Sequence, residues 1–225
     1  MNIYTIYSES HVKLFEKFRD SLLGLGLPVF SRDAPQLCSG DYGSEGSTDF
    51  WKLNIEYFLD ICILEKNPFL YVDCDVMFIK DPTKDLEKRI KGRDLVAQLD
   101  KRICGYPMIC TGIMCIRPSD KTKRMFGWML KHIERFGNDQ KAINHYLLYG
   151  RIKWTTLPKT YYSINYDNGN KVWDGGELTI KKRDYMAFHL NWTIGIKNKL
   201  YLLNQIRRKT IYDQEFYKYG IFEEQ

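Results

Sequence analysis

Apolar residues along the chain recur in two patterns, short unbroken runs and a helical spacing of three to four, and the two patterns alternate. Residues 2–7 form a short run typical of a strand, and Leu14, Phe18 and Leu22 then follow at helical spacing until Gly24 ends the helix. Later segments repeat this order. Strands are predicted at residues 28–31, 69–72, 94–99, 109–116 and 185–190, and helices from about residue 47 to before Pro68 and at residues 121–136, 140–149 and 196–209.

This alternation predicts an α/β fold, with one domain over residues 1–225, a mostly parallel central sheet and helices on both faces of the sheet. A chain of 225 residues is long enough for one sizeable core. Residues 39–47 are predicted to be a Gly- and Ser-rich loop, and residues 156–183 to be irregular with short strands. Ligands of such sheets bind beyond the carboxyl ends of the strands, so the chemistry is expected just after strands.

The 34 basic and 28 acidic residues give a net charge of +6 and are spread along the whole chain. This mild excess favours a small phosphate-bearing partner over nucleic acid, which more often meets a concentrated basic stripe. The six cysteines include no C-x-x-C pair and lie mostly among apolar residues, which favours a reducing compartment. Neither a signal peptide nor a membrane-spanning apolar run is visible, so we expect a soluble cytoplasmic protein.

Two acidic residues, Asp73 and Asp75, interrupt an otherwise almost wholly apolar segment, residues 69–78. A carboxylate beside a core is costly unless it is paired, hydrogen-bonded or bound to a cation. In an extended chain a D-x-D spacing points both carboxylates to one side, where they could share a hard divalent ion such as Mn²⁺ or Mg²⁺. Two other interpretations remain open. The acids could cap a turn at the strand end, or Asp73 could be the nucleophile of a haloacid-dehalogenase phosphatase, whose D-x-D strand normally lies near the N-terminus.

The segment FLYVDCDVMFIKDP, residues 69–82, resembles the GT-A glycosyltransferases, and in particular their nucleotide-diphospho-sugar transferase group. A second segment, FHLNWTIGIKNK at residues 188–199, is similar to the C-terminal element of the same group. The resemblance covers nearly the whole chain and implies a Rossmann-like GT-A domain. Residues 1–100 would form its nucleotide-binding half, and residues 101–225 the half that completes the metal site and receives the acceptor.

These two segments imply a metal and donor site. By resemblance, His189 is the third metal ligand beside Asp73 and Asp75, and Asp73 also contacts the donor. Gly195 and Lys199 would meet the donor diphosphate, together with backbone N–H groups at the start of the last helix. An imidazole suits a coordination sphere begun by two carboxylates.

Three further positions match the family in its order. Lys52, on the helix before the D-x-D strand, would be directed at the donor, and Thr111 and Gly112 would let the backbone approach the donor sugar. Asp139 and Gln140 would lie near the reacting carbon. Each position has a structural alternative: a solvated helix lysine, a glycine bulge in a buried strand, and the first turn of a helix, respectively.

The resemblance implies transfer of a sugar from a nucleotide diphosphate, most often UDP, to a hydroxyl of a glycan, glycoprotein or glycolipid, with Mn²⁺ or Mg²⁺ as cofactor. UDP-glucose is a reasonable first donor. Asp139, Gln140 and Lys199 are the catalytic candidates on this interpretation. Retention or inversion at the anomeric carbon is left open, because inversion needs a base and three candidates remain: Asp100, Asp139 and Asp174.

The last predicted helix supports an alternative of a different class. Its basic side is formed by Lys197, Lys199, Arg207, Arg208 and Lys209, and its apolar side by Leu200, Leu203 and Ile206. Such a helix could make the protein a non-catalytic module that binds nucleotides or a membrane surface. Packing of the apolar side on the core is the favoured interpretation, and it leaves peripheral membrane contact compatible with an enzyme.

Overall fold

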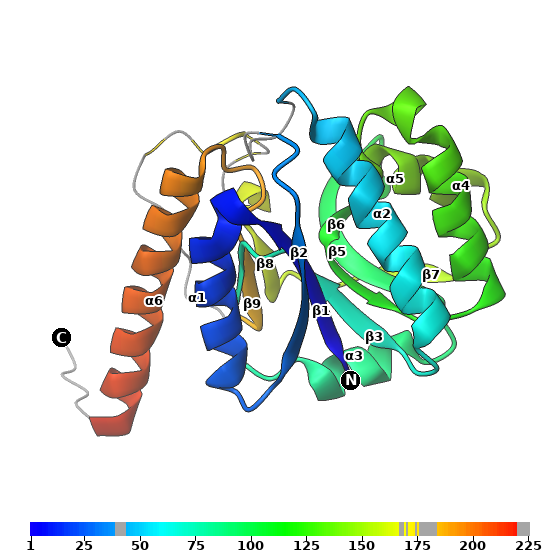
Figure 1. Ribbon diagram of the computed structural model, residues 1–225. Helices are drawn as coiled ribbons and strands as arrows, with labels where there is room; N and C mark the ends of the chain where they lie inside the picture. The colour runs from blue at the N-terminus through cyan, green and yellow to red at the C-terminus, as the bar shows by residue number, and fades with distance from the viewer. Residues whose placement is uncertain (39–43, 167–168, 170, 174, 176–183, 220–225) are drawn as a thin grey trace.

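The computed structural model describes residues 1–38, 44–166, 169, 171–173, 175 and 184–219, without the side chains of residues 208–219. Within these ranges six strands form a central sheet with helices on both faces, and three short strands form a second sheet (Figure 1). The predicted Gly- and Ser-rich loop lies partly outside the described residues. None of the helices in these ranges is both long and apolar enough to cross a lipid bilayer.

The central sheet has the strand order β2-β1-β3-β6-β5-β7. The strands are β1 (Ile3–Ser8), β2 (Val29–Ala34), β3 (Phe69–Val72), β5 (Leu95–Ile103), β6 (Tyr106–Ile116) and β7 (Trp154–Thr156). Strand β1 pairs in parallel with β2 and β3, and β5 pairs in parallel with β7. Strand β6 is antiparallel to both β3 and β5. The sheet is therefore mostly parallel, as predicted, with an antiparallel strand in its middle.

Strands β5 and β6 are longer than predicted because they form a hairpin. Ile103 pairs with Tyr106 across a two-residue turn, in which Cys104 has φ 49° and Gly105 has φ 80°. Two left-handed residues are what a tight hairpin turn requires, and glycine supplies this conformation at no steric cost. Cysteine is an unusual first residue for such a turn, which is why the sequence pattern ended the first strand too early and began the second too late.

The helices cover the two faces of the central sheet and build two cores. One core receives side chains from α1 (Val12–Leu23), α3 (Thr83–Ile90) and α6 (Ile196–Tyr219), and the other from α2 (Ser47–Leu64), α4 (Asp120–Phe136) and α5 (Asp139–Tyr149). On α1, Leu14, Phe18 and Leu22 are completely buried. Each such side chain contributes about 1.5–3 kcal/mol to stability. The helical spacing seen in the sequence thus marks the face that packs on the sheet.

The apolar side of α6 packs on the protein. Leu203 is 2% exposed and Ile206 is fully buried, in the same core as α1. Lys199 points inward as well, with only 20% of its side chain exposed. The side chains of Arg208 and Lys209 lie outside the described residues, so the basic side of this helix is described only in part.

The second sheet has the order β4-β9-β8 and consists of β4 (Val76–Phe78), β9 (Ala187–His189) and β8 (Tyr161–Ser163). Strands β4 and β9 are antiparallel, and their register pairs Val76 with His189. Residues far apart in the sequence therefore become neighbours: the residue after the D-x-D pair faces the histidine of the C-terminal segment. This pairing places the site described below.

Short elements account for most differences from the predicted pattern. Helix α3, with eight residues, and strands β4 and β7, with three each, were not predicted as separate elements. Two 3-10 helices, Glu9–His11 and Ile164–Tyr166, complete the described elements. Periodicity needs several repeats to emerge, so elements of one or two turns give too little signal.

Candidate functional site

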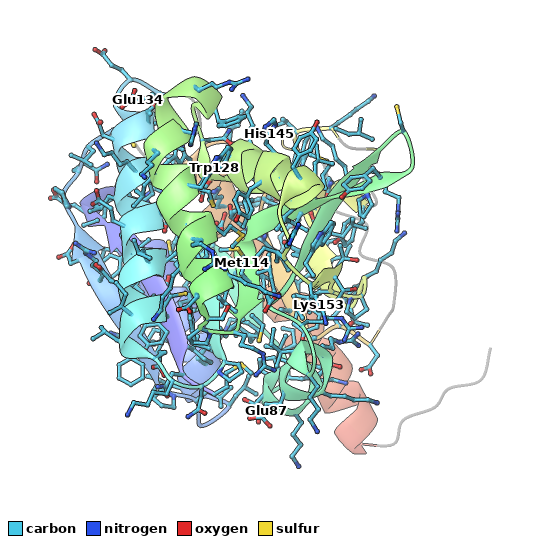
Figure 2. The ribbon with its side chains drawn as sticks, turned by 90° about the vertical axis from the view of Figure 1, so that its right-hand side faces the viewer. Glu87, Met114, Trp128, Glu134, His145 and Lys153 are labelled. Atoms are coloured by element: carbon cyan, nitrogen blue, oxygen red, sulfur yellow. The ribbon has the colours of Figure 1, made fainter. Side chains whose placement is uncertain are left out.

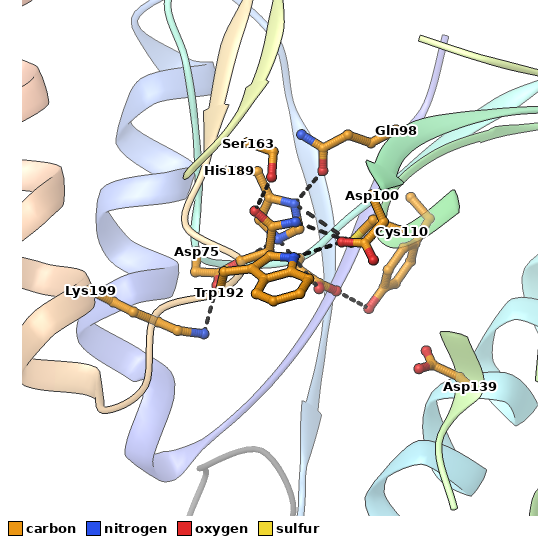
Figure 3. Close-up of polar contacts among 12 residues, drawn as sticks. Asp75, Gln98, Asp100, Cys110, Asp139, Ser163, His189, Trp192 and Lys199 are labelled. Carbon is orange, nitrogen blue, oxygen red and sulfur yellow. Dashed lines mark hydrogen bonds and ion pairs between the residues drawn. The ribbon is translucent and has the colours of Figure 1, made fainter. Parts of the chain in front are cut away.

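Asp73, Asp75 and His189 meet where β3, β4 and β9 come together, and Figure 3 shows Asp75 and His189 there. His189 Nε2 lies 3.2 Å from Asp75 Oδ1 and 3.9 Å from Asp73 Oδ2. One ligand atom from each residue lies within 4.8 Å of the others. The structure thus brings together the three residues that the resemblance named as metal ligands.

The carboxylates reach the same side by a turn, and the expectation of an extended chain at the D-x-D pair is wrong. Strand β3 ends at Val72, the chain turns through Cys74, and the N–H of Val76 donates to the carbonyl of Asp73 at 3.3 Å. The N–H of Asp73 donates to the Gly112 carbonyl at 2.9 Å, which holds the turn against β6. A turn lets the chain pass from the central sheet to the second sheet between the two acids.

Gln98 determines how the His189 ring is presented. Gln98 Oε1 lies 2.5 Å from His189 Nδ1, and Gln98 Nε2 donates to the carbonyls of Tyr161 and Tyr162, each at 3.1 Å. These two donor bonds orient the amide so that its oxygen accepts from Nδ1–H. In the neutral imidazole Nε2 is then the nitrogen with the lone pair, and it faces the two carboxylates. Cys110 Sγ also approaches Nδ1, at 3.9 Å.

Gly112 leaves the space that the histidine and the first acid occupy. A Cβ at this position would lie 2.6 Å from His189 Nε2 and 2.7 Å from Asp73 Oδ2. Side chains do not approach so closely, so any residue other than glycine would push the ligands apart. The glycine predicted to allow close approach therefore does so toward the metal-ligand candidates, whereas the predicted partner was the donor sugar.

The three residues fit a divalent cation. Asp75 is buried, and its Oδ1 accepts no hydrogen bond of good geometry from the described residues although it lies beside His189. A buried carboxylate oxygen without a donor is costly unless a cation supplies the missing contact. Two carboxylates and one imidazole suit Mn²⁺, Mg²⁺ or Zn²⁺.

The charges at this centre are strongly coupled. Burial acts to raise the pKa of Asp75, but the positive charges of Lys199 and His189 hold it below its ordinary value. The pKa of Asp73 is raised, first by burial and then by the negative charge of Asp75. For His189, burial acts to lower the pKa, and the Asp75 carboxylate outweighs it and raises the pKa well above the usual range. Protons and a metal ion therefore compete for the same groups.

Lys199 is bound to the second acid of the pair. Its Nζ donates to Asp75 Oδ2 at 2.7 Å. Lys199 belongs to the first turn of α6, whose start is formed by Gly195 with φ 87°, and the N–H of Lys199 donates to the Gly195 carbonyl at 3.1 Å. The helix start thus lies close to the D-x-D pair, with the lysine paired to a carboxylate.

A chain of hydrogen bonds runs from Asp73 to Asp139. Tyr71 Oη donates to Asp73 Oδ1 or Asn54 Oδ1, at 3.1 and 2.9 Å, and Asn54 Nδ2 donates to Asp139 Oδ2 at 3.1 Å. Asp139 also interacts with the Thr111 side chain. Burial, and then the charge of Asp73, raise the pKa of Asp139 to about 7. Asp139 and Thr111 are thereby linked to the metal-ligand candidates through buried polar groups.

Gln140 faces a different acid, Asp100. Gln140 Nε2 donates to Asp100 Oδ2 at 3.2 Å, and Trp192 Nε1 donates to Asp100 Oδ1 at 2.7 Å. Burial raises the pKa of Asp100. Trp192 has φ 63°, a left-handed conformation that is rare for a bulky residue, and Lys101 Nζ lies 5.1 Å from its ring centre. Such strain concentrates at functional sites, so this group is a candidate for the acceptor side.

Two predicted residues stay apart from this centre. Lys52 is exposed on α2 and makes no hydrogen bond or ion pair with the described residues, and Asn54 is the α2 residue that enters the network. Asp174 lies outside the described residues.

The sequence interpretation gave no role to Gln98, Tyr71, Asn54 and Trp192. Gln98 and Asn54 carried the same signal as the D-x-D pair, a polar residue at a buried position: Gln98 stands in the apolar segment LVAQLD, and Asn54 lies at helical spacing from Phe58. Nothing in the sequence pattern pointed to the hydroxyl of Tyr71 or to the strained backbone of Trp192.

Comparison with known proteins adds to this geometry. A family model described as nucleotide-diphospho-sugar transferase matches residues 24–203. The fold is similar to that of the galactosyltransferase LgtC, at 13% identity, with 85% of this chain and 87% of that chain covered and a TM-score of 0.55.

A glycosyltransferase involved in glycosylation of the major capsid of PBCV-1 is similar at 12% identity over 84% and 93% of the two chains, with a TM-score of 0.55. Mouse xyloside xylosyltransferase 1 is similar at 11% identity over 84% and 97%, with a TM-score of 0.52. No curated protein sequence matches the chain significantly. At these identities, the likeness to the solved structures concerns the fold.

Proposed function

Because the chain belongs to the nucleotide-diphospho-sugar transferase family, we propose that it moves a sugar from a UDP-sugar to an acceptor hydroxyl, with Mn²⁺ or Mg²⁺ held by Asp73, Asp75 and His189. The family match and the GT-A fold support a nucleotide-diphosphate donor and an acceptor. We propose in addition that the nucleotide is UDP, that a divalent ion is required, and that the acceptor is a glycan, glycoprotein or glycolipid.

One observation supports the proposal above all others. The register of β4 and β9 places the imidazole Nε2 of His189 beside two carboxylates, and the buried Oδ1 of Asp75 accepts no hydrogen bond of good geometry from the described residues. Residues 1–100 supply the acids and residues 101–225 supply the histidine. This division is consistent with one domain in which the second half completes a site begun by the first.

Lys199 is proposed to stabilise the leaving group. When bound, the ion supplies positive charge next to the departing diphosphate. The Lys199 ammonium already lies at the same centre, 2.7 Å from Asp75 Oδ2. A diphosphate oxygen arriving there would compete with the carboxylate for this ammonium, and the N–H groups at the start of α6 would add their partial charges.

Asp139 and Gln140 are proposed to bind the donor sugar. With a pKa of about 7, the buried Asp139 carboxyl is largely protonated below neutral pH, and it can then donate a hydrogen bond to a polar group that reaches it. Thr111 interacts with the same carboxyl, and Gln140 holds Asp100 on the other side of the site. These contacts would orient the sugar between the D-x-D pair and Trp192.

The proposal is tested by the binding of UDP in the presence and absence of Mn²⁺, followed by calorimetry or thermal stabilisation. We expect UDP to bind the wild type only with the ion, and Asp75→Ala to lose this binding while its far-UV circular dichroism is unchanged. A screen of UDP-sugars, starting with UDP-glucose, then identifies the donor by ion-dependent release of UDP. Equal turnover by wild type and Asp75→Ala would contradict the site assignment.

The two alternatives predict other outcomes. A phosphatase would hydrolyse simple phosphate esters, and a basic binding module would bind lipid or nucleic acid in a manner that falls with salt and ignores Mn²⁺. Family membership argues against both, and the inward direction of Lys199 removes one cation from the proposed basic side of α6.

A further inference from the structure

A cavity of about 630 Å³ lies between α4 and the C-terminal end of α5, on the face that Figure 2 presents with Trp128 and His145 labelled. The side chains that matter to its chemistry are cationic or aromatic: Lys121, Arg124, Arg151, Trp128, Tyr146 and Tyr149. None of them belongs to the D-x-D centre. Asp139 begins α5 and Tyr149 ends it, so the helix separates the two places by about 15 Å at 1.5 Å per residue.

The charged side chains that line this cavity are all basic. No acidic residue is among the described residues that line it, and Arg124 and Arg151 are exposed and form no ion pair in the described part of the chain. Lys121 Nζ has one distant carboxylate, Asp94 Oδ2 at 3.9 Å, which also accepts a bond from the N–H of Lys153. Guanidinium groups without acidic partners are well suited to bind carboxylate, sulfate or phosphate groups.

The aromatic groups favour a sugar over a nucleobase. The indole of Trp128 is stacked against His132 at 4.2 Å and against His145 at 5.8 Å, with interplanar angles of 20° and 9°. Two imidazoles therefore already stack on this ring, which disfavours stacking of a nucleobase there. Tyr149 is 79% exposed although its ring lies 5.4 Å from that of His145, and Tyr146 lies beside Trp128 at 5.4 Å. Partly covered rings and phenol hydroxyls suit the mixed apolar and hydroxyl surface of a saccharide.

The backbone at the end of α5 contributes to the shape of the cavity. The N–H of Gly150 donates to the Tyr146 carbonyl at 2.6 Å, and a Cβ at Gly150 would lie 2.5 Å from Tyr146 Cε1. Only glycine lets the chain leave the helix directly against the tyrosine ring. This turn brings Arg151 to the same cavity as Arg124 of α4.

We propose that this cavity is a second binding site, for a saccharide that carries a phosphate, sulfate or carboxylate group. The arginines bind the anionic group, and Tyr146 and Tyr149 contact the sugar. The site acts by binding alone and holds no reacting group. We further propose that this second site holds an acidic part of the acceptor away from the transfer centre. This role rests on the proposed function, whereas the binding of an acidic saccharide does not.

The test is calorimetric titration with three probes, glucose 6-phosphate, inorganic phosphate and glucose, each with and without UDP and Mn²⁺. We expect glucose 6-phosphate to bind at least about tenfold more tightly than either fragment, because the site contacts both parts of it. Binding should persist with UDP and Mn²⁺ present. Displacement by UDP and Mn²⁺ would place the sugar phosphate in the transfer centre and overturn the proposal.

Two variants and a matched control locate the binding. The double variant Arg124→Glu/Arg151→Glu should weaken glucose 6-phosphate binding by at least about tenfold. Tyr149→Ala should weaken it severalfold; this residue is exposed, and its replacement leaves the net charge unchanged. The control is Lys13→Glu/Lys131→Glu, which makes the same change in net charge at exposed positions outside the cavity. Unchanged affinity in both cavity variants, or equal loss in the control, would refute the site.

Discussion

Gln98 Oε1 lies 2.5 Å from His189 Nδ1, and this contact decides which nitrogen of His189 faces Asp73 and Asp75. A histidine that binds a metal through Nε2 is commonly held by an acceptor at Nδ1, which fixes its tautomer and its ring orientation. The acceptor here comes from the middle of β5, ninety-one positions from the histidine in the sequence. The geometry of the centre is therefore set by a residue that does not itself reach the proposed ion.

Replacing Gln98 with leucine removes this acceptor. We expect Mn²⁺ affinity to fall by about 10–100-fold, the usual cost of losing such a supporting contact. Titration of Mn²⁺ at a temperature where the protein is fully folded measures the change. Val96→Ala, a change at another buried position of β5, controls for lost packing. The interpretation fails if both variants bind Mn²⁺ equally well.

Gly112 allows the close approach of His189 and Asp73. In Gly112→Ala the added Cβ meets both ligands at under 3 Å, so we expect lost Mn²⁺ binding and a destabilisation of about 1–3 kcal/mol from overpacking. Gly127→Ala is the matched control, because no atom lies within 4 Å of its added Cβ in the interior of α4. This control should be more stable than the wild type by about 0.5–1 kcal/mol. Denaturant unfolding measures both, and retained Mn²⁺ binding in Gly112→Ala would contradict the packing argument.

Asp139 makes stability depend on pH. Its pKa is about 7 in the folded protein against an ordinary value of 3.8, so the folded state holds one more proton than the unfolded state between these values. The contribution of this group to the free energy of unfolding therefore falls as pH rises from about 4 to 7, by at most about 4 kcal/mol. We expect Asp139→Asn to gain stability relative to the wild type over this range.

Denaturant unfolding of the wild type and Asp139→Asn at several pH values tests this prediction. The contributions of most other titrating groups cancel in the difference between the two free energies of unfolding. The asparagine can keep the local bonds if Asn54 turns its amide, so the variant should fold. Parallel stability curves from pH 4 to 7 would mean that Asp139 is ionised throughout and that its burial is less costly than argued.

Lys199 and a divalent ion compete for Asp75. In Lys199→Met the carboxylate loses its cation, so Mn²⁺ alone should bind severalfold more tightly, whereas Mn²⁺ with UDP should bind more weakly. Lys197→Met, on an exposed position of the same helix, should change neither affinity. Calorimetric titrations with Mn²⁺ and with UDP and Mn²⁺ separate the two effects. A parallel loss of both would assign Lys199 a purely structural role.

The order of elements and the ligand candidates could be predicted from the sequence, each for a physical reason. Buried strands such as Phe69–Val72 and one-sided helices such as Val12–Leu23 impose a pattern that is visible locally. Asp73 and Asp75 stood out because charged residues interrupt an apolar segment. His189 was found only through resemblance, since its contact with the acids depends on the β4 to β9 pairing across the chain.

The remaining features depend on tertiary contacts that no local pattern contains. The turn at Cys74 contradicts the extended D-x-D pair because the chain changes sheets there. Lys52 was predicted to be directed at the donor and is exposed on α2, whereas Asn54 on the same helix donates to Asp139. Gln98 was not singled out because it lies within a strand of mostly apolar residues.

The central claim is that Asp73, Asp75 and His189 bind one divalent ion, and pulsed electron paramagnetic resonance of bound Mn²⁺ tests it most directly. The account predicts one bound ion with a nitrogen coupling from a histidine, which is lost in His189→Gln and retained in His132→Gln. A bound Mn²⁺ whose nitrogen coupling survives in His189→Gln, or a wild type that binds no Mn²⁺ even with UDP, would contradict it.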